Sequence, residues 1–224
     1  MKRFYRTLRI VWGITLFGVL SLASSQSNAT LLNLSLDLPD FYAYFTSVGY
    51  NAGTDAFQAL GYTGTYTDSG GTHDAGGGNY TLTATITGAG VLTSGSLTIE
   101  GEVSDLATGP GTLLTGSLTT GTEGTAFGST NGGNGLFEFR FTVTGGILSN
   151  QFGGVGASNC GVIMSPEFAG EFDGTWLNSF SNDGISGFSD NAVLVPEPST
   201  FFLLALGVAL CVATHRNFKR IRVP

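Results

Sequence analysis

Short stretches in which apolar and polar residues alternate, separated by glycines, dominate the middle of this sequence. Successive side chains of a β-strand point to opposite faces, so each stretch predicts a strand with one buried and one exposed face. The apolar members of the two clearest stretches are Leu82, Ala84 and Ile86, and Phe137, Phe139, Phe141 and Val143. No stretch of this region shows the 3.6-residue period of an amphipathic helix. The middle of the chain is therefore predicted to be all-β.

Glycine sets the spacing of these stretches. Residues 30–195 hold 32 of the 35 glycines of the chain, and turn signals recur about every 8–12 residues, as in antiparallel sandwiches and barrels. We expect one Gly/Thr-rich antiparallel β domain, a sandwich or a barrel, over residues 30–194. Gly-Ser-Leu-Thr occurs twice, at 95–98 and 116–119. Two copies indicate a pair of similar strands, because a solenoid needs at least three repeats.

Individual elements follow from the same pattern. A hairpin is expected from residues 44–50 and 56–62, joined by a loop at 51–55 that contains a glycine. The other expected strands cover residues 31–36, 80–87, 97–103, 112–119, 137–143 and 162–164. Long loops are expected at 70–78 and 124–135, and the domain is expected to end within 183–191.

The charged residues are sorted along the chain. Eight of the nine Lys and Arg residues lie within residues 2–9 or 216–222, and only Arg140 lies between. Residues 30–195 carry 1 basic against 15 acidic residues, a net charge of −14. Such a body repels phosphate groups, so a nucleic-acid partner is excluded.

The N-terminal segment has the pattern of an export signal. Basic residues within 2–9 precede an apolar run of 13 residues, 10–22, which is shorter than the ~20 residues that a membrane-spanning helix needs. Ser27 and Ala29 supply the small residues that signal peptidase recognises. We expect a signal peptide over residues 1–29, cut between Ala29 and Thr30. The alternative is an uncleaved N-terminal anchor.

The C-terminal segment has three parts. Val195 precedes the tripeptide Pro196, Glu197 and Pro198, which two prolines keep extended and out of a helix. A short hydrophobic helix is expected at about 200–214, and a basic tail at 216–222 should stop transfer across the membrane. The basic residues of this tail are Arg216, Lys219, Arg220 and Arg222. The alternative is an ordinary single-span tail anchor.

In this order, residues 195–222 resemble a PEP-CTERM sorting domain. The resemblance implies that an exosortase-type processing enzyme acts at the motif Pro196, Glu197 and Pro198. It also implies a transient membrane anchor, followed by delivery to the cell surface, the outer envelope or the extracellular space. Because the family mostly occurs in Gram-negative bacteria that make extracellular polysaccharide, polysaccharide is implied as a partner.

No catalytic residues are predicted in the β domain. Its one histidine, His73, lies in a glycine-rich loop, whereas a general base needs a rigid setting. Cys160 is interpreted as a small buried hydrophobe, with an intermolecular disulfide as the alternative. The carboxylate pairs are Glu100 with Glu102, and Glu171 with Asp173. Glu100 and Glu102 lie on a predicted wet face, where nothing raises a pKa as glycoside hydrolysis requires.

Two binding features remain as candidates. Asn182-Asp183-Gly184 with Asp190-Asn191, or Asp68 with Asp74, offer oxygen ligands for a structural Ca²⁺, but the spacing of known Ca²⁺ loops is absent and no metal site is assigned. A row of threonines on one strand face could bind a carbohydrate or ice surface, although threonine is also favoured on any exposed strand. The row consists of Thr81, Thr83, Thr85 and Thr87.

Together these features predict an exported, surface-sorted, non-enzymatic protein with a structural or adhesive role and no cofactor. One alternative is a carbohydrate- or ice-binding module that uses the threonine row. A second alternative is a hydrolase of matrix polysaccharide.

Overall fold

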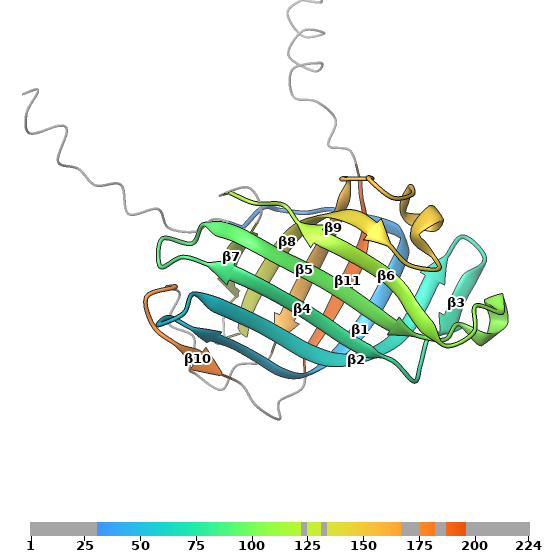
Figure 1. Cartoon of the computed structure of the whole chain (residues 1–224), viewed down its shortest axis with the longest axis horizontal. Helices are drawn as coiled ribbons and strands as arrows, with labels where there is room; N and C mark the ends of the chain where they lie inside the picture. The colour runs from blue at the N-terminus through green and yellow to red at the C-terminus, as the bar shows by residue number, and fades with distance from the viewer. Residues whose placement is uncertain (1–30, 122–124, 131–133, 167–174, 182–186, 196–224) are drawn as a thin grey trace, which may run out of the picture.

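The structure, a computed structural model, describes residues 31–121, 125–130, 134–166, 175–181 and 187–195. These residues form eleven β-strands and two short 3-10 helices (Figure 1). The strands are β1 (Leu36–Asn51), β2 (Ala56–Asp68), β3 (Gly71–Asp74), β4 (Asn79–Ile86), β5 (Leu92–Gly101), β6 (Gly111–Leu118), β7 (Thr125–Thr130), β8 (Asn134–Gly145), β9 (Cys160–Pro166), β10 (Phe180–Ser181) and β11 (Gly187–Leu194). The 3-10 helices are η1 (Ser104–Leu106) and η2 (Ser149–Phe152).

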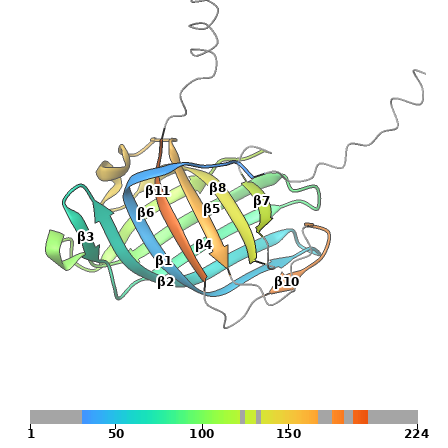
Figure 2. The same ribbon diagram turned by 180° about the vertical axis from the view of Figure 1, so that it is seen from behind.

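Eight of the strands form a closed antiparallel barrel. Strands β1, β2, β4, β5, β6, β8, β9 and β11 each pair with the next one in this order, and β11 pairs with β1 to close the ring. Figure 2 shows β1 and β11 side by side at this closure. The short strands β3, β7 and β10 add to β2, β8 and β1 respectively. The prediction of a single antiparallel β domain is confirmed, and of its two forms the barrel is correct.

The predicted alternation decides which side chains fill the barrel. On β8, the four predicted apolar positions from Phe137 to Val143 are at most 1% exposed. On β4, Leu82 and Ile86 are fully buried, while the threonines between them face outward. Burying one such apolar side chain contributes about 1.5–3 kcal/mol, so the pattern that predicts the strands also supplies the core.

Close packing against an aromatic ring explains why position 116 is a glycine. Phe141 on β8 lies over Gly116 of β6, and a β-carbon at position 116 would stand 2.4 Å from the ring atom Cδ2. Interiors pack at crystal-like density, so the large ring needs a small residue opposite. The same logic makes the Gly-Ser-Leu-Thr repeat structural, because Gly95 of the other copy lies against Leu118.

Several boundaries differ from the sequence prediction. The glycine-rich segment 70–78 contains β3, which pairs with β2, and the segment 124–135 contains all of β7 and the start of β8. The expected end of the domain at 183–191 overlaps β11, which closes the barrel. Residues 31–35 precede β1 and are not a strand. The added strands β3, β7 and β11 each depend on a partner strand, which local composition does not reveal.

Candidate functional sites

The predicted threonine row lies on the outer face of β4. Thr81, Thr83 and Thr85 face outward there, between buried aliphatic residues. Thr87 does not belong to the row, because β4 ends at Ile86 and the Thr87 hydroxyl accepts the amide of Val91 in the following turn over 3.2 Å. The fourth predicted position therefore lies just past the end of the strand.

The row continues across neighbouring strands, which the sequence analysis did not foresee. In register with Thr81 are Thr98 on β5 and Thr115 on β6; in register with Thr83 are Ser96, Ser117 and Thr142. Many hydroxyls bond to one another: Thr83 Oγ1 and Ser96 Oγ are 3.1 Å apart, and Ser94 donates to Thr85 over 3.1 Å. The arrangement forms a hydroxyl face across β4, β5, β6 and β8.

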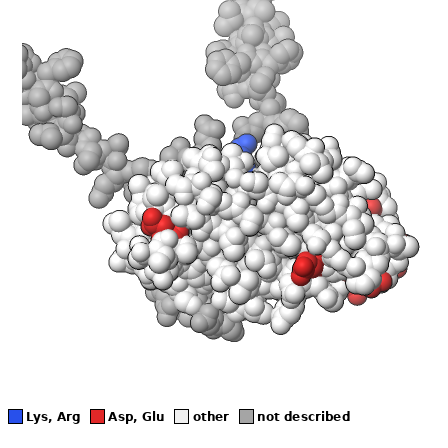
Figure 3. Space-filling model, viewed as in Figure 1, with Lys and Arg blue, Asp and Glu red and all other residues white. Residues whose placement is uncertain are grey.

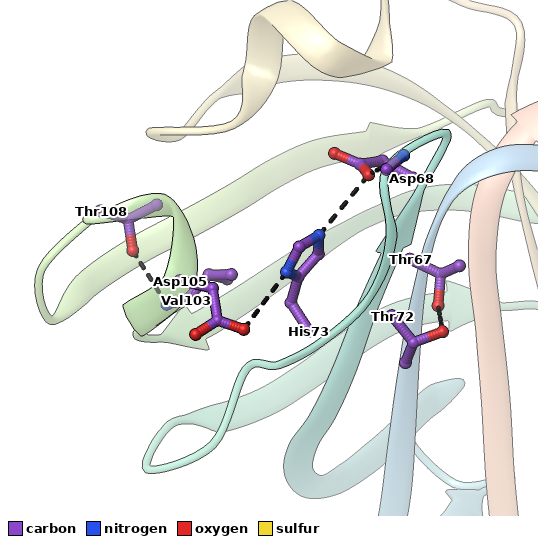
Figure 4. Close-up of polar contacts among 8 residues, drawn as sticks. Thr67, Asp68, Thr72, His73, Val103, Asp105 and Thr108 are labelled. Atoms are coloured by element: carbon purple, nitrogen blue, oxygen red, sulfur yellow. Dashed lines mark hydrogen bonds and ion pairs between the residues drawn. The ribbon is translucent and has the colours of Figure 1, made fainter.

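His73 lies on β3, not in a loop, and two aspartates flank it (Figure 4). Its Nε2 is 3.6 Å from Asp68 Oδ1, and its Nδ1 is 3.5 Å from Asp105 Oδ2. The Tyr66 ring stacks against the imidazole at 6.1 Å between centroids. The nearby Thr67 and Thr72 hydroxyls bond to each other. Both imidazole nitrogens of His73 face carboxylates, so the group ties β3 to η1. In a catalytic triad one of the two nitrogens faces the nucleophile instead.

The carboxyl groups whose pKa the fold raises are not those that the sequence pattern indicated. Glu100 accepts a hydrogen bond from the Asn79 amide over 3.3 Å at the surface, and Glu102 follows the end of β5. By contrast, desolvation and the nearby Asp190 charge raise the pKa of Asp40 to about 6, and burial also raises the pKa of Asp190. These two aspartates lie on neighbouring strands 150 positions apart in sequence, so no local signal points to the pair.

Cys160 is fully buried in the core, and burial raises its pKa to about 11. Its Sγ lies 3.8 Å from the carbonyl oxygen of Phe152. A buried thiol with a raised pKa is a poor nucleophile. The structure thus agrees with the interpretation of Cys160 as a small hydrophobe rather than as an intermolecular disulfide.

The candidate Ca²⁺ ligands do not converge. Asp68 and Asp74 each accept the amide two residues on, from Gly70 and Gly76 respectively, within their own turns. The Asn191 side chain is buried in the barrel, whereas Asp190 lies on the outside. The described residues contain no group of three or more His, Cys, Asp or Glu side chains placed to hold a metal ion. Glu171, Asp173 and the loop Asn182-Asp183-Gly184 lie outside the described residues.

The two ends of the described chain lie side by side. Leu36 pairs with Leu194 at the end of the β1–β11 ladder. The amide of Val195 donates to the carbonyl oxygen of Ser35 over 2.8 Å. The segments before residue 31 and after residue 195 are therefore attached at one place on the barrel, which the sequence alone could not show.

Residues 31–35 form a strap over the outer face of β8. The carboxylate of Glu138 accepts the amides of Asn33 and Leu34 over 2.9 and 3.2 Å, and this cover leaves Glu138 only 3% exposed. Beside it, Arg140 lines a hollow of about 410 Å³ together with residues of the strap and of the end of β11. The strap therefore fixes the N-terminal end of the described chain to β8.

Residues 194–217 match the family description of the PEP-CTERM protein-sorting motif. The chain carries a PEP-CTERM sorting motif. The match begins at Leu194, the last residue of β11, so this motif directly follows the strand that closes the barrel. It implies export and sorting to the cell surface through an exosortase, and it confirms the recognition made from the sequence.

The other predicted processing residues lie outside the described part of the structure. They are Ala29, Thr30, Pro196, Glu197, Pro198, Arg216, Lys219, Arg220 and Arg222. Among the described residues, no helix has the length and hydrophobicity needed to span a membrane. No curated protein and no solved structure matches the chain.

Proposed function

We propose that this protein is exported, processed by signal peptidase and an exosortase-type enzyme, and retained as a structural or adhesive component of the cell surface or extracellular matrix. The observation that carries the proposal is the position of the PEP-CTERM motif directly after β11. Cleavage at residues 196–198 would remove the sorting segment and leave every strand of the barrel in place. A sorting signal outside the folded unit is what a removable anchor requires.

The adjacent chain ends support a transient anchor. Because Val195 bonds to Ser35, a signal peptide before residue 31 and a tail after residue 195 would hold the barrel to the membrane at the same place. The rest of its surface would then face away from the membrane. Release at both ends would free the barrel without further rearrangement.

The charge of the body supports a non-catalytic role in a hydrated matrix. Fifteen acidic residues against one basic residue in 30–195 keep the body soluble and repel anionic lipid and nucleic acid. Figure 3 shows the acidic side chains of one face as separate spots among uncharged residues. A dispersed negative charge of this kind could bind divalent cations that bridge it to matrix polysaccharide.

The first test replaces the sorting tripeptide. Changing Pro196, Glu197 and Pro198 to Ala in the full-length chain should leave the protein in the membrane fraction, because the processing enzyme no longer recognises the linker. Cell fractionation with immunoblotting measures the distribution. Pro110→Ala, at an exposed position before β6, is the matched control and should be released like the wild type.

Mass spectrometry of the released protein should give an N-terminus at Thr30 and a C-terminus close to residue 196. Unchanged release of the triple variant would refute the processing role of the tripeptide. If the protein releases reducing sugar from a polysaccharide and Asp40→Asn abolishes this release, the non-catalytic role is refuted and the hydrolase alternative is favoured.

A second candidate function is carbohydrate binding by the hydroxyl face. Its support is the register that places Thr83, Ser96 and Ser117 in one row on three strands. A barrel wall curves and twists, which suits a flexible polymer better than a flat ice plane. Thr83→Ala with Thr85→Ala should weaken retention on a glycan panel and any thermal hysteresis; retention unchanged by both substitutions counts against it.

A further inference from the structure

Four aromatic side chains form a strip on the outside of the barrel, beside the hydroxyl face. Phe188 on β11, Tyr44 on β1 and Tyr62 on β2 are direct neighbours in register, and Tyr42 lies beside them. The exposed fractions are 43% for Phe188, 51% for Tyr44 and 59% for Tyr62. Contiguous exposed apolar groups of this kind mark interaction surfaces. These four residues are called the aromatic strip.

The rings of the strip are held in place before any ligand arrives. Tyr42 and Phe188 stack at 5.6 Å between centroids with 19° between the planes, and Tyr44 meets Tyr42 edge-on at 5.0 Å. Tyr44 also lies against Gly64: its Cε2 is 2.6 Å from where a β-carbon of that residue would stand. Only glycine leaves room for the ring there. Fixed rings lose little conformational entropy on binding.

A groove with polar walls continues from the strip. Tyr62 lines a shallow hollow of about 400 Å³ that crosses β4 and reaches Glu100 on β5. Asn79, in register with Tyr62, donates to Glu100 Oε2 over 3.3 Å. From β11 to β5 the strip and groove cross four strand spacings, about 19 Å at ~4.8 Å each. These four spacings are half of the eight-stranded ring, so the surface accommodates several sugar rings in a chain that follows the curve of the barrel wall.

The charges around this surface indicate which class of ligand it binds. Asp190 pairs with Tyr42 across the β1–β11 ladder, and Glu100 stands at the far end of the groove. The one basic residue of the described part, Arg140, lies in a different hollow, beside the strap. Carboxylates accept hydrogen bonds from hydroxyl donors and repel anions. Flat apolar rings with a few acceptors at the rim complement the C–H faces and hydroxyl edges of a sugar chain.

We infer that the aromatic strip and its groove form a binding site for a neutral polysaccharide, with Tyr44 and Tyr62 as the stacking platforms and Glu100 as a hydroxyl acceptor. The inference rests on the proposed location at the cell surface, where such polymers occur. It assigns the adhesive contact to the outer face of β11, β1 and β2 and to the groove that continues across β4 to β5. Of the threonine row only Thr81 lines the groove, so the site does not depend on Thr83 or Thr85.

The test is affinity electrophoresis of the exported full-length gene product in gels that contain dextran or hydroxyethyl cellulose. The wild type should be retarded, and Tyr44→Ala with Tyr62→Ala should weaken binding by about tenfold or more, as loss of central aromatic contacts does elsewhere. Tyr44→Phe with Tyr62→Phe keeps the rings and should keep most of the retardation. Val155→Ala, 70% exposed on another loop, is the matched control and should behave as wild type.

Four outcomes would overturn the inference. The first is no retardation of the wild type in both neutral gels, and the second is stronger retardation in alginate than in the neutral gels. The third is that Thr83→Ala with Thr85→Ala loses binding while the double tyrosine variant keeps it. The fourth is a dimer in size-exclusion chromatography that the double tyrosine variant dissociates. Fractionation of the same cells shows separately whether the protein reaches the surface. A protein that is sorted but does not bind these glucans contradicts this inference and leaves the proposed function standing.

Discussion

Asp40 of β1 and Asp190 of β11 lie on neighbouring strands where the barrel closes. The carboxylate of Asp40 accepts the Asn191 amide over 3.0 Å, a contact that favours the charged form. Desolvation and the Asp190 charge outweigh it and raise the pKa of Asp40 to about 6. The folded state therefore retains a proton that the unfolded chain has released at the same pH. At the scale of single residues, this makes the closure of the barrel sensitive to pH.

Stability should fall as the pH rises through the pKa of Asp40. Below the ordinary aspartate pKa of 3.8 the carboxyl is protonated in both states, and above about 6 it is charged in both, at a cost to the folded state. Asp40→Asn keeps an oxygen for the Asn191 amide and removes the charge. Thermal melts from pH 4 to pH 7 should show a smaller decline for the variant and a higher Tm at pH 7. Asp74→Asn, at the last residue of β3, is the control. Equal pH profiles for wild type and Asp40→Asn would contradict the assignment.

At the scale of elements, a polar contact ties β4 to β11 through the interior. The buried Tyr80 hydroxyl donates to Asn191 Oδ1 over 3.0 Å. The side-chain nitrogen Nδ2 of Asn191 donates to the Phe41 carbonyl oxygen and to Ser189 Oγ. Burial raises the pKa of Tyr80, so the hydroxyl stays protonated as a donor. These strands are not neighbours in the sheet, so the contact fixes their relative position across an otherwise apolar core.

Removing the donor should destabilise the barrel. Tyr80→Phe leaves Asn191 Oδ1 buried without its partner, which costs about 1–3 kcal/mol of the free energy of unfolding. Urea denaturation followed by fluorescence measures the change. Tyr62→Phe, at an exposed tyrosine of the adjacent strand, should change stability by less than about 0.5 kcal/mol. Equal effects of the two substitutions would show that the buried contact contributes little.

At the scale of the whole molecule, closure depends on the last strand. β11 pairs with β1 on one side and with β9 on the other. Without it, β1 and β9 would each present an unpaired edge, which promotes aggregation. The sorting motif begins where this strand ends. The barrel strands, which the fold needs, therefore lie before this border, and the removable sorting segment lies after it.

Truncation tests this border. A chain that ends at Val195 should fold into a soluble monomer, because all strand pairs and the contact to Ser35 remain. A chain that ends at residue 186 lacks β11 and should aggregate. Circular dichroism and size-exclusion chromatography distinguish the two results. Aggregation of the longer chain would show that residues after 195 are needed for folding.

The candidate sites differ in how far sequence could predict them. The row from Thr81 to Thr85 was predictable because strand alternation is a local property. Its continuation to Ser96 and Ser117 was not, since register depends on hairpin turns and bulges. His73 was assigned to a loop because glycines surround it, and only pairing of β3 with β2 places it between two aspartates.

The sequence by itself determined the all-β class, the inward and outward faces of the main strands and the PEP-CTERM segment, because each depends on residues that are close together along the chain. The tertiary structure decided that the sheet closes through β11, that Asp40 meets Asp190, and that Tyr44, Tyr62 and Phe188 form one strip. Those contacts join residues far apart in sequence. They depend on strand order and register, which are fixed only when the whole core packs.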